Sequence, residues 1–336
     1  MVIENAHHIN GGLVIYEIFD SESLSQIQTL GNSSTSSFKV FENDGKVQML
    51  VGNYYEPGRI APPDVSSKLY TWNENTSRFY MTGEVNVYGV RDVDHIKLAN
   101  NDSFLALSVH DDTRTYDLPT FIYRYMSSEG RFYCYRQLRT TAARRVNFFT
   151  FNSTLYLFVA ERVNTDNSHN TNSSVYRWNS TDFMLLQEIE TIGAFDLLPF
   201  SIGDCFFVVA VNNRHNHSYN VQSKVYLMID GVFKFFASLD TRGATKTDFF
   251  RIGLESFLVF SNSHDDGSVI TNSVVYRFEG GTFVIHQEIL TQNAMYVHFF
   301  TLENGSPALA FANKAGKPAL YKWKSLSYIC PEGNCQ

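Results

Sequence analysis

Short apolar stretches of two kinds alternate along the whole chain. Residues 206–211 and 257–260 are continuous apolar runs, whereas residues 187–191 alternate apolar and polar side chains. A continuous run of this length predicts a strand buried on both faces, and alternation predicts a strand with one face in solvent. Turn residues such as Asn43-Asp44-Gly45 separate the runs. The pattern therefore predicts antiparallel hairpins and an all-β fold.

One tetrad recurs along these hairpins: an aliphatic residue, a tyrosine, usually a basic residue and then an aromatic one, as in Val175-Tyr176-Arg177-Trp178. The spacing between successive copies is about 50 residues. The tyrosines of the tetrad are Tyr16, Tyr70, Tyr123, Tyr176, Tyr226, Tyr276 and Tyr321. Each repeat reads as four strands, A to D, with the tetrad on strand C and the continuous apolar run on strand B. Their fixed place predicts that the tyrosines pack between blades.

Four antiparallel strands in each of seven repeats predict a seven-bladed β-propeller of four-stranded antiparallel blades. A linear solenoid has shorter repeats, and a sandwich has no reason to repeat in sequence. We expect one domain over residues 1–336. Residues 1–5 resemble the end of a B strand, so the first blade is expected to be incomplete or to be completed by residues 325–336.

Composition and charge narrow the function. Aromatic residues make up 15% of the 336 residues, and the net charge is −7. Without a basic excess the chain is not expected to bind nucleic acid. No apolar run reaches the ~20 residues that a membrane span needs, and residues 1–8 have no signal-peptide pattern.

The repeat resembles the epilepsy-associated repeat, known as EAR or EPTP, over nearly the full chain. The third interval carries it most completely, in the tetrad at 175–178, Phe183, Gln187-x-Ile189-x-Thr191 and the apolar run 208–210. Thr71 and Leu227-Met228 depart from it. Such repeats occur in the secreted leucine-rich glioma-inactivated proteins and in thrombospondin-type laminin G domain and EAR repeat-containing proteins. The resemblance implies a secreted seven-bladed propeller that binds other proteins and is not an enzyme.

A propeller places its B–C and D–A connections on one side and its A–B and C–D turns on the other. The B–C connections are the long ones here, and long loops on a rigid scaffold favour binding. We therefore expect an extracellular or cell-surface partner, a receptor or matrix protein, on the B–C/D–A face. The candidate contact residues are Tyr54, Tyr55, Tyr116, Arg214 and His264.

Two other functions stay open. A lectin-like propeller would bind glycans through repeated aromatic loop residues such as Tyr54, Tyr55 and Tyr116. A hydrolase would assemble its site from separate blades, although no nucleophile elbow, phosphate loop or HExxH motif occurs. His110-Asp111-Asp112 and His264-Asp265-Asp266 follow equivalent strands and read as metal or acid–base candidates or as polar loop residues.

Eight sequons favour a secreted glycoprotein when taken together with the resemblance. Their asparagines are Asn32, Asn75, Asn101, Asn152, Asn172, Asn179, Asn216 and Asn304. Most of them are predicted on the A–B and C–D turns, where glycans would obstruct a partner.

Carboxylates gather at the predicted start of strand A, the innermost strand. Capping of turns is the default role of Asp92, Asp94, Asp196 and Asp248. The alternative is that they converge near the mouth of the channel and hold a structural Ca²⁺. No other cofactor is expected.

The four cysteines are too few for a disulfide scaffold. Cys330 and Cys335 enclose a turn-like spacer and are a candidate local disulfide. Cys134 and Cys205 lie in predicted strands rich in aromatic residues and are predicted to be buried thiols.

Overall fold

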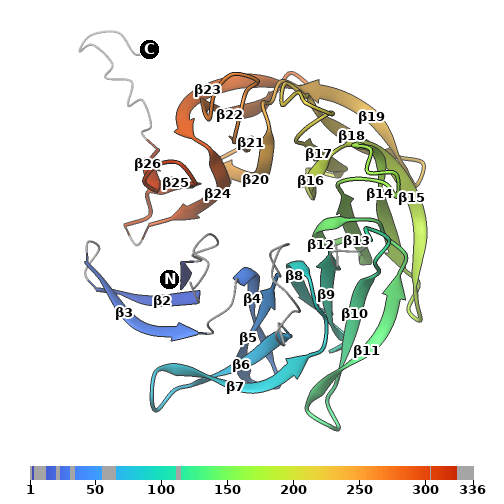
Figure 1. Cartoon of the computed structure of the whole chain (residues 1–336), viewed down its shortest axis with the longest axis vertical. Coiled ribbons are helices and arrows are strands. Elements are labelled where there is room, and N and C mark those ends of the chain that lie inside the picture. Colours follow the sequence, from blue (N-terminus) through green and yellow to red (C-terminus); the bar gives the residue numbers. More distant parts are fainter. Residues whose placement is uncertain are drawn as a thin grey trace, which may run out of the picture.

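The computed structural model describes residues 2–3, 13–19, 23–30, 35–54, 66–110, 115–302 and 304–323. All regular elements in these ranges are β-strands, which form antiparallel sheets of consecutive strands. Figure 1 shows the sheets arranged in sequence order around a common axis, with the first strand of each blade innermost. The chain is thus an all-β propeller, as predicted.

Each strand position recurs from blade to blade. The innermost A strands are β4 (Thr35–Asn43), β8 (Val90–Lys97), β12 (Ala143–Phe151), β16 (Ala194–Ile202), β20 (Ala244–Ile252) and β24 (Ala294–Thr301). The B strands are β5 (Lys46–Asn53), β9 (Ser103–Val109), β13 (Thr154–Glu161), β17 (Cys205–Asn212), β21 (Glu255–Asn262) and β25 (Pro307–Asn313). The C strands are β6 (Ser67–Asn73), β10 (Thr120–Met126), β14 (Asn170–Trp178), β18 (Ser223–Ile229), β22 (Ile270–Glu279) and β26 (Ala319–Lys322). The outer D strands are β7 (Arg78–Val85), β11 (Arg131–Leu138), β15 (Phe183–Ile192), β19 (Val232–Leu239) and β23 (Thr282–Gln292).

The number of complete blades corrects the sequence prediction. Five sheets have four strands, while β1 (Val2–Ile3), β2 (Leu13–Phe19) and β3 (Ser23–Leu30) form a three-stranded sheet at the N-terminal end. At the C-terminal end, β24, β25 and β26 form another three-stranded sheet. Seven four-stranded blades with only the first incomplete are therefore not observed, because no outer strand follows β26 within the described residues. The suggested closing segment, residues 325–336, lies outside those residues.

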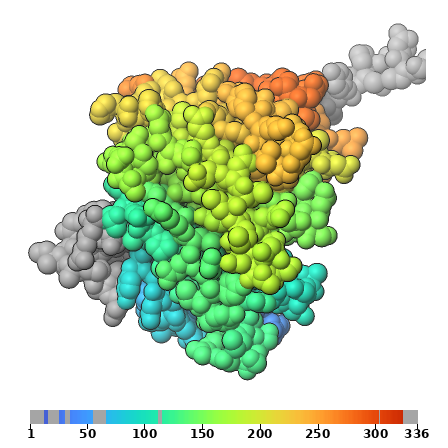
Figure 2. All heavy atoms as spheres, turned by 90° about the vertical axis from the view of Figure 1, so that its right-hand side faces the viewer, coloured from blue at the N-terminus to red at the C-terminus, as the bar shows by residue number. Residues whose placement is uncertain are grey.

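The B strands form the centre of each blade. All residues of β9 are buried, and β17 and β21 are buried after their first residue. The apolar clusters join neighbouring sheets, since Phe104 of one sheet packs with Trp178 and Phe183 of the next. Figure 2 shows the outer flank, on which consecutive sheets follow one another in sequence order. Burial between sheets therefore supplies most of the core, as repeat architectures require.

Tyr176, Tyr226 and Tyr276 are buried and bond to the preceding blade. A β-bulge interrupts the C–D pairing immediately before the tyrosine in each of the six C–D pairs, for example between Val175 and Tyr176. The Tyr176 hydroxyl donates a hydrogen bond to the Arg139 carbonyl of the preceding blade at 2.9 Å. Tyr226 and Tyr276 make the equivalent bonds, to the carbonyls of residues 190 and 240. Burial raises the pKa of Tyr176 to about 12.

Glutamine side chains bridge neighbouring outer strands in the opposite direction along the chain. The Gln187 amide donates to the Phe233 carbonyl at 2.8 Å and accepts from the Phe233 N–H at 2.7 Å. Gln28 makes the same pair of bonds with Phe79. The glutamine of the repeat thus satisfies both backbone groups of an aromatic residue on the next blade.

The D–A connections position the long B–C loops. The residue before each of five A strands has a positive φ: Gly89, Ala142, Gly193, Gly243 and Asn293. In Ala142, Gly193, Gly243 and Asn293 the N–H bonds a B–C loop carbonyl, as in Gly193 to His169 at 2.7 Å. In each of the five, the carbonyl accepts a bond from the residue after strand B, as in Asn213 to Gly193 at 3.3 Å. The B–C and D–A connections therefore lie on one face, as predicted.

The cysteine prediction was wrong for the two described thiols. Cys134 and Cys205 are both exposed and free. Cys134 lies on the outer strand β11, and Cys205 is the first residue of β17, directly after the turn, so neither side chain reaches the core. Cys330 and Cys335, the predicted disulfide pair, lie outside the described residues.

Tyr176→Ala is expected to lower the free energy of unfolding by about 2–4 kcal/mol, because it empties a buried aromatic position and removes a hydroxyl bond. Tyr321→Ala is the control, since Tyr321 is 37% exposed in the last sheet whereas Tyr176 is 6% exposed. Urea denaturation of both variants measures the difference. Equal losses would contradict the placement of Tyr176 between blades.

Gly193→Ala is expected to destabilise the protein more than Gly203→Ala. Both glycines have a φ near +55°, so the cost of the left-handed conformation, about 1–2 kcal/mol, is shared. A Cβ on Gly193 would lie 2.4 Å from the Arg214 carbonyl oxygen, whereas one on Gly203 would meet nothing within 4 Å. Thermal unfolding of the two variants compares them, and similar midpoints would count against the close approach.

Candidate interaction face and channel

A β-bulge after the first residue of strand A places one side chain from each of six blades at an equivalent position around the axis. The six residues after these bulges are Ser37, Asp92, Arg145, Asp196, Lys246 and Tyr296. Four consecutive members alternate in charge. We refer to these six residues as the channel ring.

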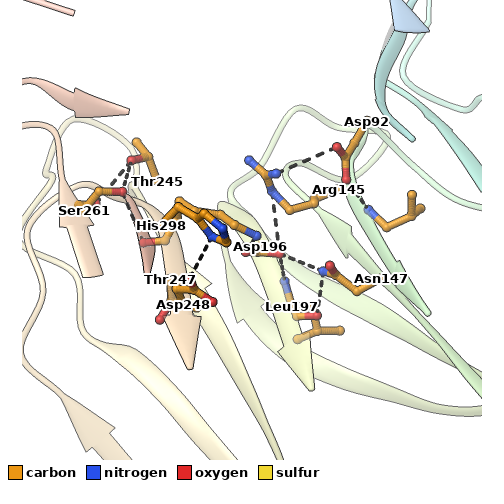
Figure 3. Close-up of polar contacts among 12 residues, drawn as sticks. Asp92, Arg145, Asn147, Asp196, Leu197, Thr245, Thr247, Asp248, Ser261 and His298 are labelled. Atoms are coloured by element: carbon orange, nitrogen blue, oxygen red, sulfur yellow. Dashed lines mark hydrogen bonds and ion pairs between the residues drawn. The ribbon is translucent and has the colours of Figure 1, made fainter. Parts of the chain in front are cut away.

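The charges of the channel ring are paired from blade to blade. Arg145 lies between Asp92 and Asp196, at 3.8 and 3.6 Å, as Figure 3 shows. Lys246 approaches the other oxygen of Asp196 at 2.8 Å. The Ser37 hydroxyl donates to Asp92 at 2.7 Å. The ring thus links the inner strands of neighbouring sheets through alternating acids and bases.

Burial and pairing compete in setting the pKa of each aspartate. Burial raises the pKa of Asp196, but Lys246 and Arg145 together outweigh it, so that pKa lies below its ordinary value. For Asp92, burial prevails over Arg145 and Ser37, and its pKa is raised. A buried carboxylate that contacts two cationic side chains is held charged more firmly than one that contacts a single cationic side chain.

A second row of side chains lies two residues further along strand A. Lys39 pairs with Asp94 at 2.6 Å, and His298 pairs with Asp248 at 3.0 Å. The bond from Asp248 raises the pKa of His298. Asp94 also accepts the Phe148 N–H.

Three aspartates bond backbone N–H groups on the inner strand of the next blade. Asp92 accepts from Val146 at 3.1 Å, Asp94 from Phe148 at 2.8 Å, and Asp248 from Phe299 at 2.8 Å. They occupy donors that would otherwise line the open edge of the sheet.

The predicted convergence on Ca²⁺ of Asp92, Asp94, Asp196 and Asp248 is not observed. Each carboxylate is engaged by amino, guanidinium, imidazole or backbone donors of a neighbouring blade. Within the described ranges there is no group of three His, Cys, Asp or Glu side chains that could hold a metal ion. Cationic side chains take the positions at which the sequence suggested a metal.

The predicted contact residues of the B–C/D–A face lie in aromatic and cationic groups. Tyr54 is buried, with the Arg91 guanidinium 3.0 Å from its ring centre. Tyr116 is half-buried and packs edge-on against His110. Tyr55 lies outside the described residues.

Arg214 and His264 come together on one tyrosine that was not predicted. The His264 ring stacks on Tyr219 at 4.7 Å, and the Arg214 guanidinium lies 5.4 Å from the same ring. Asp266 accepts the Tyr219 N–H at 2.6 Å, which holds the B–C loops of two blades together. Arg214, Tyr219 and His264 form a partly exposed platform that we call the Tyr219 platform.

Sequence reasoning also missed Arg144, Arg162 and Phe195. The Arg144 guanidinium lies 4.5 Å, and that of Arg162 5.3 Å, from the centre of the Phe195 ring. Arg144 and Phe195 occupy the same position of strand A in consecutive blades, one residue before the channel ring. Aligning the A strands by this register would have found Arg144 and Phe195, whereas Arg162 lies directly after strand β13.

The described sequons are all exposed. Asn101, Asn152 and Asn304 lie on A–B turns, and Asn75 and Asn179 on C–D turns. Asn216 lies on a B–C loop. Asn172, predicted in a loop, lies near the start of β14, and Asn32 lies outside the described residues.

A family of known proteins has a repeat similar to the one in this chain. The EPTP domain model matches residues 131–179 and 232–279, each running from an outer strand to the C strand of the next blade. No helix in the described part of the chain is long and apolar enough to cross a membrane.

Two curated relatives carry the same repeat by name. A thrombospondin-type laminin G domain and EAR repeat-containing protein from Mus musculus is 27% identical over 183 residues, which are 54% of this chain and 26% of that protein. Its Homo sapiens counterpart is 30% identical over 149 residues, 44% of this chain and 22% of that protein. The match thus spans about a quarter of the length of these relatives. The resemblance to EAR repeats is confirmed.

Among solved structures, a protein from Bacteroides fragilis described as a candidate 6-phosphogluconolactonase superposes with a TM-score of 0.57. The match covers 96% of this chain and 93% of that one, at 8% identity. This likeness shows the shared fold alone.

Asp196→Asn is expected to lower the free energy of unfolding by about 3–5 kcal/mol, because it leaves Lys246 without its acidic partner and Arg145 with Asp92 alone. Asp230→Asn, which breaks the exposed pair with Lys234, should cost less than about 1 kcal/mol. Urea denaturation measures both.

A chelator should leave the wild-type unfolding midpoint unchanged if cations of the chain hold the channel ring. A fall on chelation, reversed by added Ca²⁺, would restore the calcium hypothesis.

Proposed function

We propose that this propeller of the EAR/EPTP type is an extracellular protein-interaction module that binds a receptor or matrix protein through its B–C/D–A face. The Tyr219 platform carries the proposal. It joins aromatic and cationic side chains from two blades on the face where the longest loops gather. Tyrosine and arginine are the residues most often found to dominate binding energy at protein interfaces.

The rigid attachment of the loops supports this function. Hydrogen bonds from Ala142, Gly193, Gly243 and Asn293 hold B–C loop carbonyls against the scaffold. A loop held in this way loses little conformational freedom when a partner binds, so more of its contact energy remains as affinity.

The exposed sequons support an extracellular location and the choice of face. Five of the seven described sequons lie on the A–B and C–D turns, on the side away from the platform. Glycans on Asn75, Asn101, Asn152, Asn179 and Asn304 would cover that side and leave the B–C/D–A face open. We also propose that residues 1–336 fold as a single propeller domain.

The two alternative functions receive less support. Tyr54 is only 6% exposed and is covered by Arg91, so its ring is not free to stack on a sugar. The channel carboxylates, which a hydrolase would need as acid and base, are engaged by Arg145, Lys246 and Lys39. Protein binding therefore remains the function that the geometry favours.

Tyr219→Ala is expected to weaken binding of the purified propeller to cells of the native tissue at least about tenfold, because it removes the ring that Arg214 and His264 share. Flow cytometry with the labelled domain measures binding. Asn75→Ala and Asn179→Ala, on the opposite side, should not change it. Loss of binding in these two variants, with Tyr219→Ala unaffected, would place the partner on the other face.

A further inference from the structure

Three arginines gather at the mouth of the channel on the B–C/D–A face. Arg144 and Arg162, from one blade, lie over the same ring of Phe195, with guanidinium carbons 4.5 and 5.3 Å from its centre. Arg214, from the next blade, lies over Tyr219. Aromatic rings thus hold the guanidinium groups in place. The Nε of Arg214 donates to the Asn216 carbonyl, which leaves its two terminal nitrogens for other partners.

These guanidinium groups have no acidic partner. None of the three forms an ion pair among the described residues, and the Nε of Arg162 is buried without a hydrogen bond. Two nearby acids are engaged elsewhere: Glu161, which precedes Arg162 in the chain, and Asp266, which bonds the loop that carries Tyr219. Glu161 accepts from the Ser174 hydroxyl at 2.6 Å and the Thr141 N–H at 2.7 Å, and Asp266 accepts from Tyr219 and Ser218.

The electrostatic effect of this arrangement is repulsion among like charges. Burial, followed by Arg91 and Arg162, lowers the pKa of Arg144 well below its ordinary value. Burial and then Arg214 lower the pKa of Arg162. The pKa of His169 is lowered by burial and then by Arg162 and Arg214. Partly buried cations that repel one another are stabilised by an anion bound between them.

We propose that Arg144, Arg162 and Arg214 form an oxyanion-binding site that takes a carboxylate or sulfate group. Guanidinium groups present paired N–H donors that match two oxygens of such a group. The chain as a whole carries a net charge of −7. A positively charged site on a negatively charged protein directs anions to that site. The group could be a free anion or the acidic side chain of the partner proposed above. The inference rests on the proposed function only if the group is an acidic side chain of that partner.

Sodium sulfate is the first probe. Isothermal titration should show saturable binding to the wild-type domain, and Arg162→Met should weaken it at least about tenfold, since it removes charged donors but keeps an apolar stem on Phe195. Arg131→Gln is the control, because Arg131 is highly exposed on the outer strand β11. It should bind sulfate like the wild type.

The thermal unfolding midpoint is a second measurement, which detects sulfate binding even if the affinity is too low for titration. Without added anion, Arg162→Met should unfold at the same temperature as the wild type or higher, because one repelling charge is gone. Sulfate should then raise the wild-type midpoint more than that of the variant, at matched ionic strength. Sulfate stabilises most proteins by exclusion from their surface, so the difference between the variants is the signal. Equal shifts and no saturable heat in the titration would overturn the site.

A hexaglutamate peptide distinguishes the sources of the anion. Binding tighter than that of sulfate, weakened by Arg162→Met, would assign the site to an acidic side chain of a partner. Sulfate binding without peptide binding would assign it to a free anion. If the Arg144→Gln/Arg162→Met double variant binds both probes like the wild type, the site is wrong, whether or not Tyr219→Ala abolishes cell binding.

Discussion

The inner strand of each blade has an open edge, and the structure depends on how that edge is satisfied. Strand A pairs with strand B on one side only, so the N–H groups on its other side need partners from outside the sheet, and the preceding blade supplies them. Aspartate side chains on strand A accept several of these groups, and Arg145 and Lys246 then balance the carboxylates. Burying these charges is tolerable only because each acid has partners on neighbouring blades. The channel is therefore closed by side chains that also join the sheets.

The repeat made most of the structure of a blade predictable, but the ion pairs between the inner strands at the axis were not predicted. Local sequence patterns predicted the buried B strand, the turns and the tyrosine between blades, because each depends on residues within one repeat. The predicted channel aspartates were found on strand A, but their partners come from strands about 50 residues away. Four acids read alone suggested a metal. The same register read across repeats would have shown Asp92, Arg145, Asp196 and Lys246 alternating in sign. The sequence did not predict that the last sheet has three strands within the described residues, since the tetrad at Tyr321 matches the repeat.

Charge is distributed differently at the axis and at the rim of the channel. In the channel ring every cation has an acid beside it, whereas one residue earlier on strand A the arginines of the B–C/D–A face rest on aromatic rings. Balanced charges hold sheets together, and unbalanced ones are available to a ligand. The side chains most useful for recognition are thus adjacent in sequence to those that hold the scaffold, as the pair Arg144 and Arg145 illustrates.

The contacts between blades also have a direction. Tyr176 and its equivalents reach back to the preceding blade, while Gln187, Asp92 and Asp248 reach forward to the following one. The two sides of a blade are therefore different. The side that faces the following blade, its leading side, offers carboxylates and glutamine amides. The side that faces the preceding blade, its trailing side, offers a tyrosine hydroxyl and backbone groups. Exchanging two blades would keep this head-to-tail relation, whereas turning one blade around would match like with like. The propeller has a polarity around its ring, much as a single strand has one from its N-terminal to its C-terminal end.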